Sequence, residues 1–435
     1  MGKYIIFVAF ISLFIYLIRK DIVYIIPMIF LFYTNINGLL YYEDFAQKGV
    51  IKFPDYGFIL SILIIIYVIY FKRSKADSIF NTNNSLLLLI YFHLFYYLFL
   101  FLYSVVLQGS FEWPVKNGRF FLYGISIIAF YLLLVKDPVG KYEKVVTFLK
   151  IYTIVFSIMY IIYNYFNINF YRYEAFEIIE TDKGMVNRNF AAFPYFLMYF
   201  YCLSLIDFFN RKGNSFKNIL LIFLYLICMV SVLTRGIIIN AGIIFILAYL
   251  ISGNRRTNII YILFFFGLGF FVLKRIHYFE TGNFLALIDR GREITDVGIG
   301  STGNFEDRTK EFLNIFNNVI QFNPLFGFGF VNTSLLGFHF NIDSAGSPDN
   351  GFTNLLGISG FIGLTIFLII IIKWGLINIK LQRLKIDNYS KAHFLYIISI
   401  FLSFMNGSSS SYLQSFGLFL IYDLLIFRIY LKDTK

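Results

Sequence analysis

Three polar segments of this sequence combine arginine with asparagine and glycine. They are residues 184–190, with Arg188; residues 234–236, with Arg235; and residues 275–350, with Arg290, Arg292 and Arg308. Arginine keeps its charge and can bind two phosphate oxygens at once. Arg235 has no acidic neighbour in the sequence, so its charge needs a partner from elsewhere. The pattern predicts a site for a pyrophosphate group, and for Arg290 and Arg292 ion pairs within their own loop are an equal alternative.

Asp349 is the residue of these segments that we consider as a general base. It lies in the stretch Ser-Pro-Asp-Asn-Gly, and an aspartate of ordinary acidity is a weak base at neutral pH. Partial burial of the carboxyl group, as at the edge of a membrane, would raise its pKa. Asp349 would then be a stronger base and could abstract a proton effectively. The aspartate side chain is equally typical of tight turns. The sequence leaves the base and the turn interpretations of Asp349 open.

These polar segments interrupt a very apolar chain. Of its 435 residues, 59% are hydrophobic and 14% are charged, against about 45–50% and about 25% in soluble domains. This excludes a soluble enzyme, a nucleic-acid-binding protein and a coiled coil. The cysteines Cys202 and Cys228 lie in apolar runs, and the four histidines lack metal-binding spacing. We therefore expect no metal or other cofactor.

Long apolar runs predict an all-α polytopic membrane protein with about 12–13 transmembrane helices. The predicted spans are residues 3–18, 22–41, 56–71, 85–107, 119–135, 146–168, 190–209, 218–233, 236–252, 259–274, 351–378, 393–406 and 412–430. Three parts follow from this division. An N-terminal transmembrane bundle of about 10 helices covers residues 1–274, a large loop covers 275–350, and C-terminal helices with a tail cover 351–435.

The breaks between the runs alternate between strongly and weakly basic. The positive-inside rule places the basic set and the C-terminus in the cytoplasm, and loop 275–350 on the other side. Within the loop, apolar residues recur from Phe312 to Ile320 with helical spacing, which predicts an amphipathic helix that ends at Asn323-Pro324. Asp423 and His93 lie deepest in the apolar runs, and local structural pairing is favoured for them over a functional role.

Four segments, in this order along the chain, resemble motifs of bacterial O-antigen ligases and related polysaccharide polymerases. Residues 184–189, with Asn187 and Asn189, are similar to a Gly-x-x-Asn-x-Asn motif, and residues 234–236 to a Ser-Arg-small turn. A Pro-Leu-x-Gly-x-Gly segment that follows an arginine corresponds to Pro324, Gly327 and Gly329. A His-[Asn/Ser/Gln]-x9-Gly-x-x-[Gly/Thr/Tyr] motif corresponds to Asn350, Gly360 and Gly363, with Asp349 in place of the histidine.

The resemblance implies an enzyme of the bacterial cytoplasmic (inner) membrane that transfers glycan from polyprenyl pyrophosphate at the outer face. The transfer would invert the anomeric centre and use no metal. Arg235 and Arg308 would stabilise the leaving pyrophosphate, and Asp349 would be the base. The groups expected to bind the substrate are Arg188, Arg290, Arg292, Asn187, Asn189 and Asn350. The motif residues Pro324, Gly327, Gly329, Gly360 and Gly363 would shape the site.

The aspartate at position 349 decides between members of that family. Since the histidine is characteristic of the ligases, Asp349 favours a polymerase that joins repeat units of O-antigen, capsule or exopolysaccharide. Its partners would be the lipid-linked oligosaccharide, and further a flippase and a chain-length regulator. Ligase-type transfer of a finished glycan to a lipid or protein acceptor is the alternative. A flippase or transporter for the lipid-linked oligosaccharide is the alternative from another class.

Overall fold

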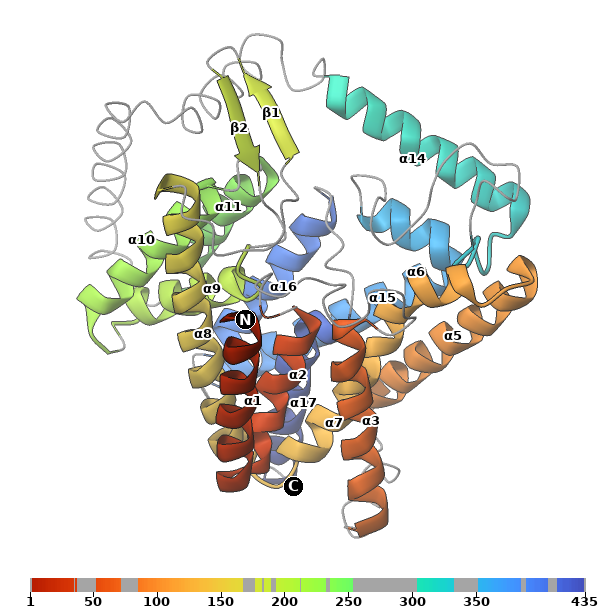
Figure 1. Cartoon of the computed structure of the whole chain (residues 1–435). Coiled ribbons are helices and arrows are strands. Elements are labelled where there is room, and N and C mark those ends of the chain that lie inside the picture. Colours follow the sequence, from red (N-terminus) through yellow and green to blue (C-terminus); the bar gives the residue numbers. More distant parts are fainter. Residues whose placement is uncertain are drawn as a thin grey trace.

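Within the residues that the structure describes, the fold is a bundle of helices with one small antiparallel strand pair (Figure 1). The computed structural model describes residues 2–34, 36, 52–71, 85–166, 177–181, 184–188, 193–211, 213–231, 235–252, 303–331, 351–384, 389–405 and 413–433. In chain order the elements are α1 (Gly2–Lys20), η1 (Ile22–Tyr24), α2 (Ile25–Tyr33), α3 (Phe53–Phe71), α5 (Ser85–Gln108), α6 (Glu112–Leu122), η2 (Tyr123–Ile125), α7 (Ser126–Leu134), α8 (Pro138–Phe166), β1 (Glu177–Thr181), β2 (Gly184–Arg188), α9 (Leu197–Phe209), α10 (Ser215–Ser231), α11 (Arg235–Ile251), α14 (Gly303–Phe322), α15 (Gly351–Arg383), α16 (Tyr389–Met405) and α17 (Leu413–Asp433).

Several of these helices are long and apolar enough to cross a membrane. Among the described residues five qualify by length and composition: Phe53–Phe71, Ser85–Gln108, Glu112–Leu134, Pro138–Tyr163 and Gly351–Arg383. Shorter apolar helices cover Ile22–Tyr33, Leu197–Phe209, Ser215–Met229, Gly236–Ile251 and Tyr389–Phe404. The prediction of a helical membrane protein is confirmed in this form. The predicted span 259–274 lies outside the described residues, and the total of about 12–13 spans stays a prediction.

α5 shows why these helices suit a lipid environment. Leu86, Ile90 and Leu100 are buried against the bundle, whereas Leu88 and Val106 are 69% and 81% exposed on the same helix. A helix that is apolar on its outer side as well needs a solvent other than water. The outward residues of α5 are therefore suited to contact lipid tails.

α9 and α17 form the interior of the bundle. α9 is apolar around most of its circumference and almost entirely buried. α17 is buried from Ser415 to Ile426, whereas Ile429 and Leu431 near its end are exposed. α9 packs against α8, α10, α11 and α16, while α17 packs against α7, α8 and α15. Such all-round burial is typical of helices at the centre of a large assembly of helices. The two helices thus connect the N-terminal bundle with the C-terminal helices.

The helix predicted within the large loop is present as α14 (Figure 1). Ile315 and Val319 are buried on its inner face, and α14 packs against α15. Its outer face is exposed at Lys310 and Leu313. The helix ends at Phe322, immediately before Asn323-Pro324, because the residue before a proline disfavours helical dihedral angles. This confirms the predicted amphipathic helix and the position of its end.

Candidate functional site

The segment after α14 forms a turn that docks onto the middle of α15. Backbone N–H groups of Phe328 and Gly329 donate to the carbonyls of Gly357 and Ile358, at 2.8 and 3.0 Å. In the other direction Phe361 and Ile362 of α15 donate to carbonyls of the turn, at Pro324 (2.9 Å) and Leu325 (3.3 Å). We call residues 323–331 the docked turn. These four bonds join segments about thirty residues apart in sequence by backbone groups alone.

A break in α15 makes these bonds available. Gly360 has φ 59° and ψ −166° inside the helix, a region that is essentially restricted to glycine. The break interrupts the helical hydrogen-bond ladder, so carbonyls and N–H groups on both sides of it are free to bond the docked turn. Gly360 therefore creates a docking site in the middle of an otherwise regular helix.

Glycines on both partners allow the backbones to come this close. A Cβ atom on Gly360 would meet the carbonyl of Leu325 and lie 2.6 Å from the nitrogen of Gly327. A Cβ atom on Gly327, which has φ +66°, would meet the carbonyl of Gly357 and lie 2.7 Å from the nitrogen of Gly360. Neither position can accept a side chain without separating the segments. The glycines of the two sequence motifs thus serve one contact.

α5 holds both partners of this contact. The Tyr96 hydroxyl donates to the carbonyl of Ser359 at 2.6 Å and lies 3.4 Å from that of Leu325. The Ser104 hydroxyl oxygen accepts a bond from the buried N–H of Phe330 at 2.7 Å. Gly329 is needed beside Ser104, since a Cβ atom there would meet the Ser104 hydroxyl. Nothing in the sequence distinguishes Tyr96 among 34 tyrosines, so neither Tyr96 nor Ser104 is predictable from the sequence alone.

The beginning of the docked turn is stabilised by its own side chains. The Asn323 side-chain oxygen accepts bonds from the N–H groups of Leu325 and Phe326, both at 3.2 Å. Pro324 follows with a dihedral angle that suits the start of a turn. The Phe326 ring packs on Phe99 of α5, with ring centroids 5.2 Å apart. Pro324, Gly327, Gly329 and Gly360 therefore all lie at the contact between the docked turn and α15.

Gly363 contacts a different group from the other motif glycines. A Cβ atom on Gly363 would meet the Ser359 hydroxyl, which itself donates to the carbonyl of Leu355 at 2.7 Å. Ser359 also supplies the carbonyl that Tyr96 binds. Gly363 thereby leaves room for the side chain of the residue that joins α5 to the docking site.

Three of the predicted catalytic and binding residues adjoin this scaffold in sequence, namely Arg308, Asp349 and Asn350. The docked turn is the direct continuation of the helix that contains Arg308, and α15 starts at Gly351, immediately after Asp349 and Asn350. Arg235 is the first residue of α11, and Asn187 and Arg188 lie on β2, where the register pairs Arg188 with Glu177 of β1. Residues outside the described ones are Asn189, Arg290, Arg292, Asp349 and Asn350, and the side chains of Asn187, Arg188, Arg235 and Arg308 are not described either.

One arginine of α6 is buried. Arg119 on α6 is 7% exposed and forms an ion pair with Asp55 of α3, at 3.1 Å between Nη1 and Oδ2. The Tyr123 hydroxyl donates to the other oxygen of Asp55. In the sequence Arg119 stands at the start of the predicted span 119–135. Its surroundings show a structural ion pair that fastens α6 to α3.

The two deep ionisable residues have different surroundings. Asp423 is fully buried and bonded to His393, Trp374 and Asn378, so the predicted local pairing of Asp423 is confirmed. His93 is also buried, at 4% exposure, but its Nδ1 has no hydrogen-bond partner in the described part of the chain. The prediction of a local pairing does not hold at this nitrogen.

Comparison with known proteins leaves the site to be interpreted on its own geometry. No family model matches the chain, and no curated protein is similar to it at a significant level. Among the described residues no group of three or more histidine, cysteine, aspartate or glutamate side chains is placed to hold a metal ion. What the described residues show is a close backbone contact between two glycine motifs, with Arg308, Asp349 and Asn350 in the adjoining sequence.

Proposed function

We propose that the protein is a membrane glycosyltransferase that joins polyprenyl-pyrophosphate-linked oligosaccharide repeat units into a surface polysaccharide. The observation that carries the proposal is the docked turn. Two of the four segments that carry the resemblance to O-antigen polymerases and ligases are glycine motifs. They are separate in sequence but form one contact, through four backbone hydrogen bonds. Motifs that meet in space support a common site better than motifs that only share an order along the chain.

The arrangement of charged segments supports an outward-facing site. In Figure 1 the C-terminus and the end of α3 lie at the lower end of the molecule, whereas α14 and the strand pair lie at the upper end. α1 also ends at the lower end, and its last turn contains Arg19 and Lys20. By the positive-inside rule that end faces the cytoplasm, so α14 faces outward. We therefore assign the transfer to the outer face of the cytoplasmic membrane.

The proposed reaction needs few groups. A hydroxyl oxygen of the acceptor glycan attacks the anomeric carbon of the donor, and its proton passes to the base, for which Asp349 is the candidate. The bond from the anomeric carbon to the pyrophosphate oxygen breaks, and the lipid pyrophosphate leaves with that electron pair. Arg308 and Arg235 would stabilise the charge that develops on the leaving group. A base in this position typically contributes about 10²–10⁴-fold in rate.

The docked turn would contribute to this chemistry by fixing the positions of the segments that contain Arg308 and Asp349. Arg308 lies on the helix that the turn holds, and Asp349 comes two residues before the start of the helix that receives it. Holding a base and an anion-binding group in fixed relation lowers the entropy that the reaction must otherwise lose. The scaffold thus provides the rigid support that a transferase site requires.

Replacement of the two arginines in cells tests the proposal. Arg308→Ala and Arg235→Ala should abolish polymer while the protein remains in the membrane, and Arg308→Lys should recover little because lysine lacks the bidentate geometry. Lys310→Ala is the matched control, since it removes an exposed cation from the same helix. Normal-length polymer in the Arg308→Ala strain would refute the pyrophosphate role.

Two further measurements refine the assignment. Asp349→Asn should abolish polymer if Asp349 is the base, and retained polymer would leave it a turn residue. In a strain without the gene, accumulation of single lipid-linked repeats indicates a polymerase. Accumulation of long lipid-linked chains would instead indicate the ligase reaction.

A further inference from the structure

One buried asparagine joins α11 to α16. The Nδ2 atom of Asn240 donates to the carbonyl of Ser399 at 3.0 Å and to the hydroxyls of Ser399 and Ser403, both at 3.1 Å. Asn240 is 1% exposed and Ser399 is 2% exposed. Because a carbonyl oxygen can only accept a hydrogen bond, it is the nitrogen of the amide that faces Ser399. We call these three residues the amide contact.

The amide contact lies near the start of α11 and near the end of α16. Arg235 is the first residue of α11, and at 1.5 Å per residue Asn240 lies about 7.5 Å further along the helix axis. On α16, Ser403 comes shortly before Met405, where the helix ends. The amide contact therefore holds the part of α11 that directly follows Arg235.

The same end of α16 also contacts the start of α15. The ring of Phe352, the second residue of α15, packs on Phe401 and Phe404 of α16, with ring centroids 5.4 and 5.2 Å apart. Asp349 precedes α15 by two residues in the sequence. One end of α16 thus supports two helices, and these helices begin at or beside Arg235 and Asp349, to which the proposed reaction assigns roles.

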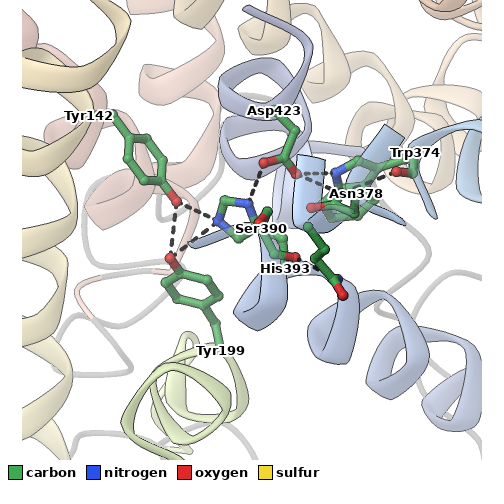
Figure 2. A network of polar contacts seen from close by, with 8 residues as sticks. Tyr142, Tyr199, Trp374, Asn378, Ser390, His393 and Asp423 are labelled. Carbon is green, nitrogen blue, oxygen red and sulfur yellow. Dashed lines mark hydrogen bonds and ion pairs between the residues drawn. The ribbon is translucent and has the colours of Figure 1, made fainter. Parts of the chain in front are cut away.

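Hydrogen bonds to other helices hold α16 itself in place (Figure 2). The Nδ1 of His393 on α16 lies 2.7 Å from an oxygen of Asp423 on α17, and its Nε2 lies 2.7 Å from the hydroxyl of Tyr142 on α8. Directional bonds between buried groups select one relative position of the helices that they join. α16 is therefore a fixed support on which α11 can be placed.

The amide contact gives direction more than stability. The Oδ1 of Asn240 is buried and has no hydrogen-bond partner in the part of the chain that the structure describes. The cost of an unpaired buried acceptor offsets what the bonds of Nδ2 contribute. Two purely apolar helices can pack in several registers, whereas a single buried asparagine selects one of them. The register of α11 on α16 is what this side chain determines.

We propose that Asn240 is a positioning residue of the glycosyltransferase. Its bonds to Ser399 and Ser403 set the register of α11 on α16 and thereby fix Arg235 relative to the start of α15. The inference rests on the proposed function, in which Arg235 stabilises the leaving pyrophosphate. A displacement of about 1 Å in such a site can lower the rate about 100-fold.

Asn240→Leu removes the bonds with little change in side-chain size. The serine hydroxyls can bond carbonyls of their own helix instead, so no group of α16 loses its only partner. Because apolar replacement of a buried polar contact is nearly neutral or stabilising, the variant should fold and melt at or above the wild-type temperature. Gly242→Ala is the matched control on α11, since nothing lies within 4 Å of its new Cβ.

Electron–electron distance measurements test the register. Spin labels at Ile246→Cys on α11 and Ile372→Cys on α15 replace side chains that are 58% and 59% exposed, and the native Cys202 and Cys228 are buried away from the reagent. The distance distribution should be narrow in the otherwise wild-type protein and in the control. Adding Asn240→Leu should broaden it or shift it by about 1.5 Å or more, the rise of one helical residue.

Calorimetric titration of the detergent-purified protein with inorganic pyrophosphate tests whether Asn240 acts through Arg235. Arg235→Ala should weaken binding about 10-fold or more, the effect of one charge-assisted hydrogen bond. Asn240→Leu should weaken it as well, and the double variant should bind no more weakly than Arg235→Ala alone. The control should bind as the wild type.

The outcomes separate this inference from the function on which it rests. Wild-type protein that does not bind pyrophosphate, or Arg235→Ala that binds it normally, would refute the proposed role of Arg235. An unchanged distance distribution in Asn240→Leu, or losses of affinity that add in the double variant, would overturn the positioning role alone. A lowered melting temperature with unchanged affinity would show that Asn240 only stabilises the fold.

Discussion

Gly360→Ala is the sharpest single perturbation of the docked turn. Gly360 has φ +59°, and a Cβ atom there would lie 2.5 Å from the carbonyl carbon of Leu325 and 2.6 Å from the nitrogen of Gly327. Both neighbours are backbone atoms, which cannot rotate away as a side chain can. The alanine therefore has to strain its own backbone and push the docked turn off the helix.

The size of the effect follows from these contacts. An alanine forced into this dihedral region costs about 1–3 kcal/mol, and overpacking adds about 1–3 kcal/mol. The chain can avoid the backbone strain and the overpacking if the docked turn separates from α15. This separation breaks four backbone hydrogen bonds, which contribute about 0.5–1.5 kcal/mol each. Both routes give about 2–6 kcal/mol. Even the lower value changes the population of the undocked turn about 30-fold.

Amide hydrogen exchange by mass spectrometry measures this directly. Peptides that cover residues 324–331 contain the protected N–H groups of Phe328 and Gly329, and their exchange should accelerate at least about 30-fold in Gly360→Ala. Gly375→Ala on the same helix is the control, since nothing lies within 4 Å of its new Cβ. That variant should exchange as the wild type and gain up to about 1 kcal/mol of helix propensity. Identical exchange in the two variants would refute the docking argument.

Two further variants test other contacts. Ser104→Ala leaves the buried N–H of Phe330 without its acceptor and should cost about 1–3 kcal/mol; an unchanged melting temperature would contradict this. Burial raises the pKa of Asp21, but bonds from Lys144 and the N–H of Val23 outweigh it and hold that pKa below its usual value. This stabilisation is present above the ordinary pKa and lost as the pH falls. Asp21→Asn should therefore lower the free energy of unfolding by about 0–1 kcal/mol at neutral pH. In acid the variant and the wild type should have the same melting temperature.

The helices of the described chain are largely predictable from local pattern. The predicted span 351–378 corresponds to Gly351–Arg383, and the predicted end of the amphipathic helix at Asn323-Pro324 coincides with the end of α14. Long apolar runs and a proline that ends a helix are local signals, so they predict helices whatever the tertiary contacts are. The span predicted to begin at residue 119 instead begins at Glu112. The first turns of α6 contain polar residues, so the apolar run that predicts the span does not include them.

The contacts between helices are not local signals. The ion pair of Arg119 with Asp55 joins residues 64 positions apart, and no local pattern in the sequence pairs them. The strand pair β1–β2 was not predicted either, because its ten residues carry a mixed polar pattern without a hairpin dipeptide between two alternating runs. Pairing of this kind depends on which surfaces meet after the helices have assembled.

By itself the sequence determined that this chain is a helical membrane protein and marked the glycines of two motifs as special, because composition and residue type act through local geometry and solvation. The tertiary structure decided that Gly327 and Gly360 serve the same contact and that Asp423 is paired with His393. The physical reason is the same in both cases. A backbone approach below 3 Å and a hydrogen bond across two helices exist only once packing has fixed the helices relative to one another.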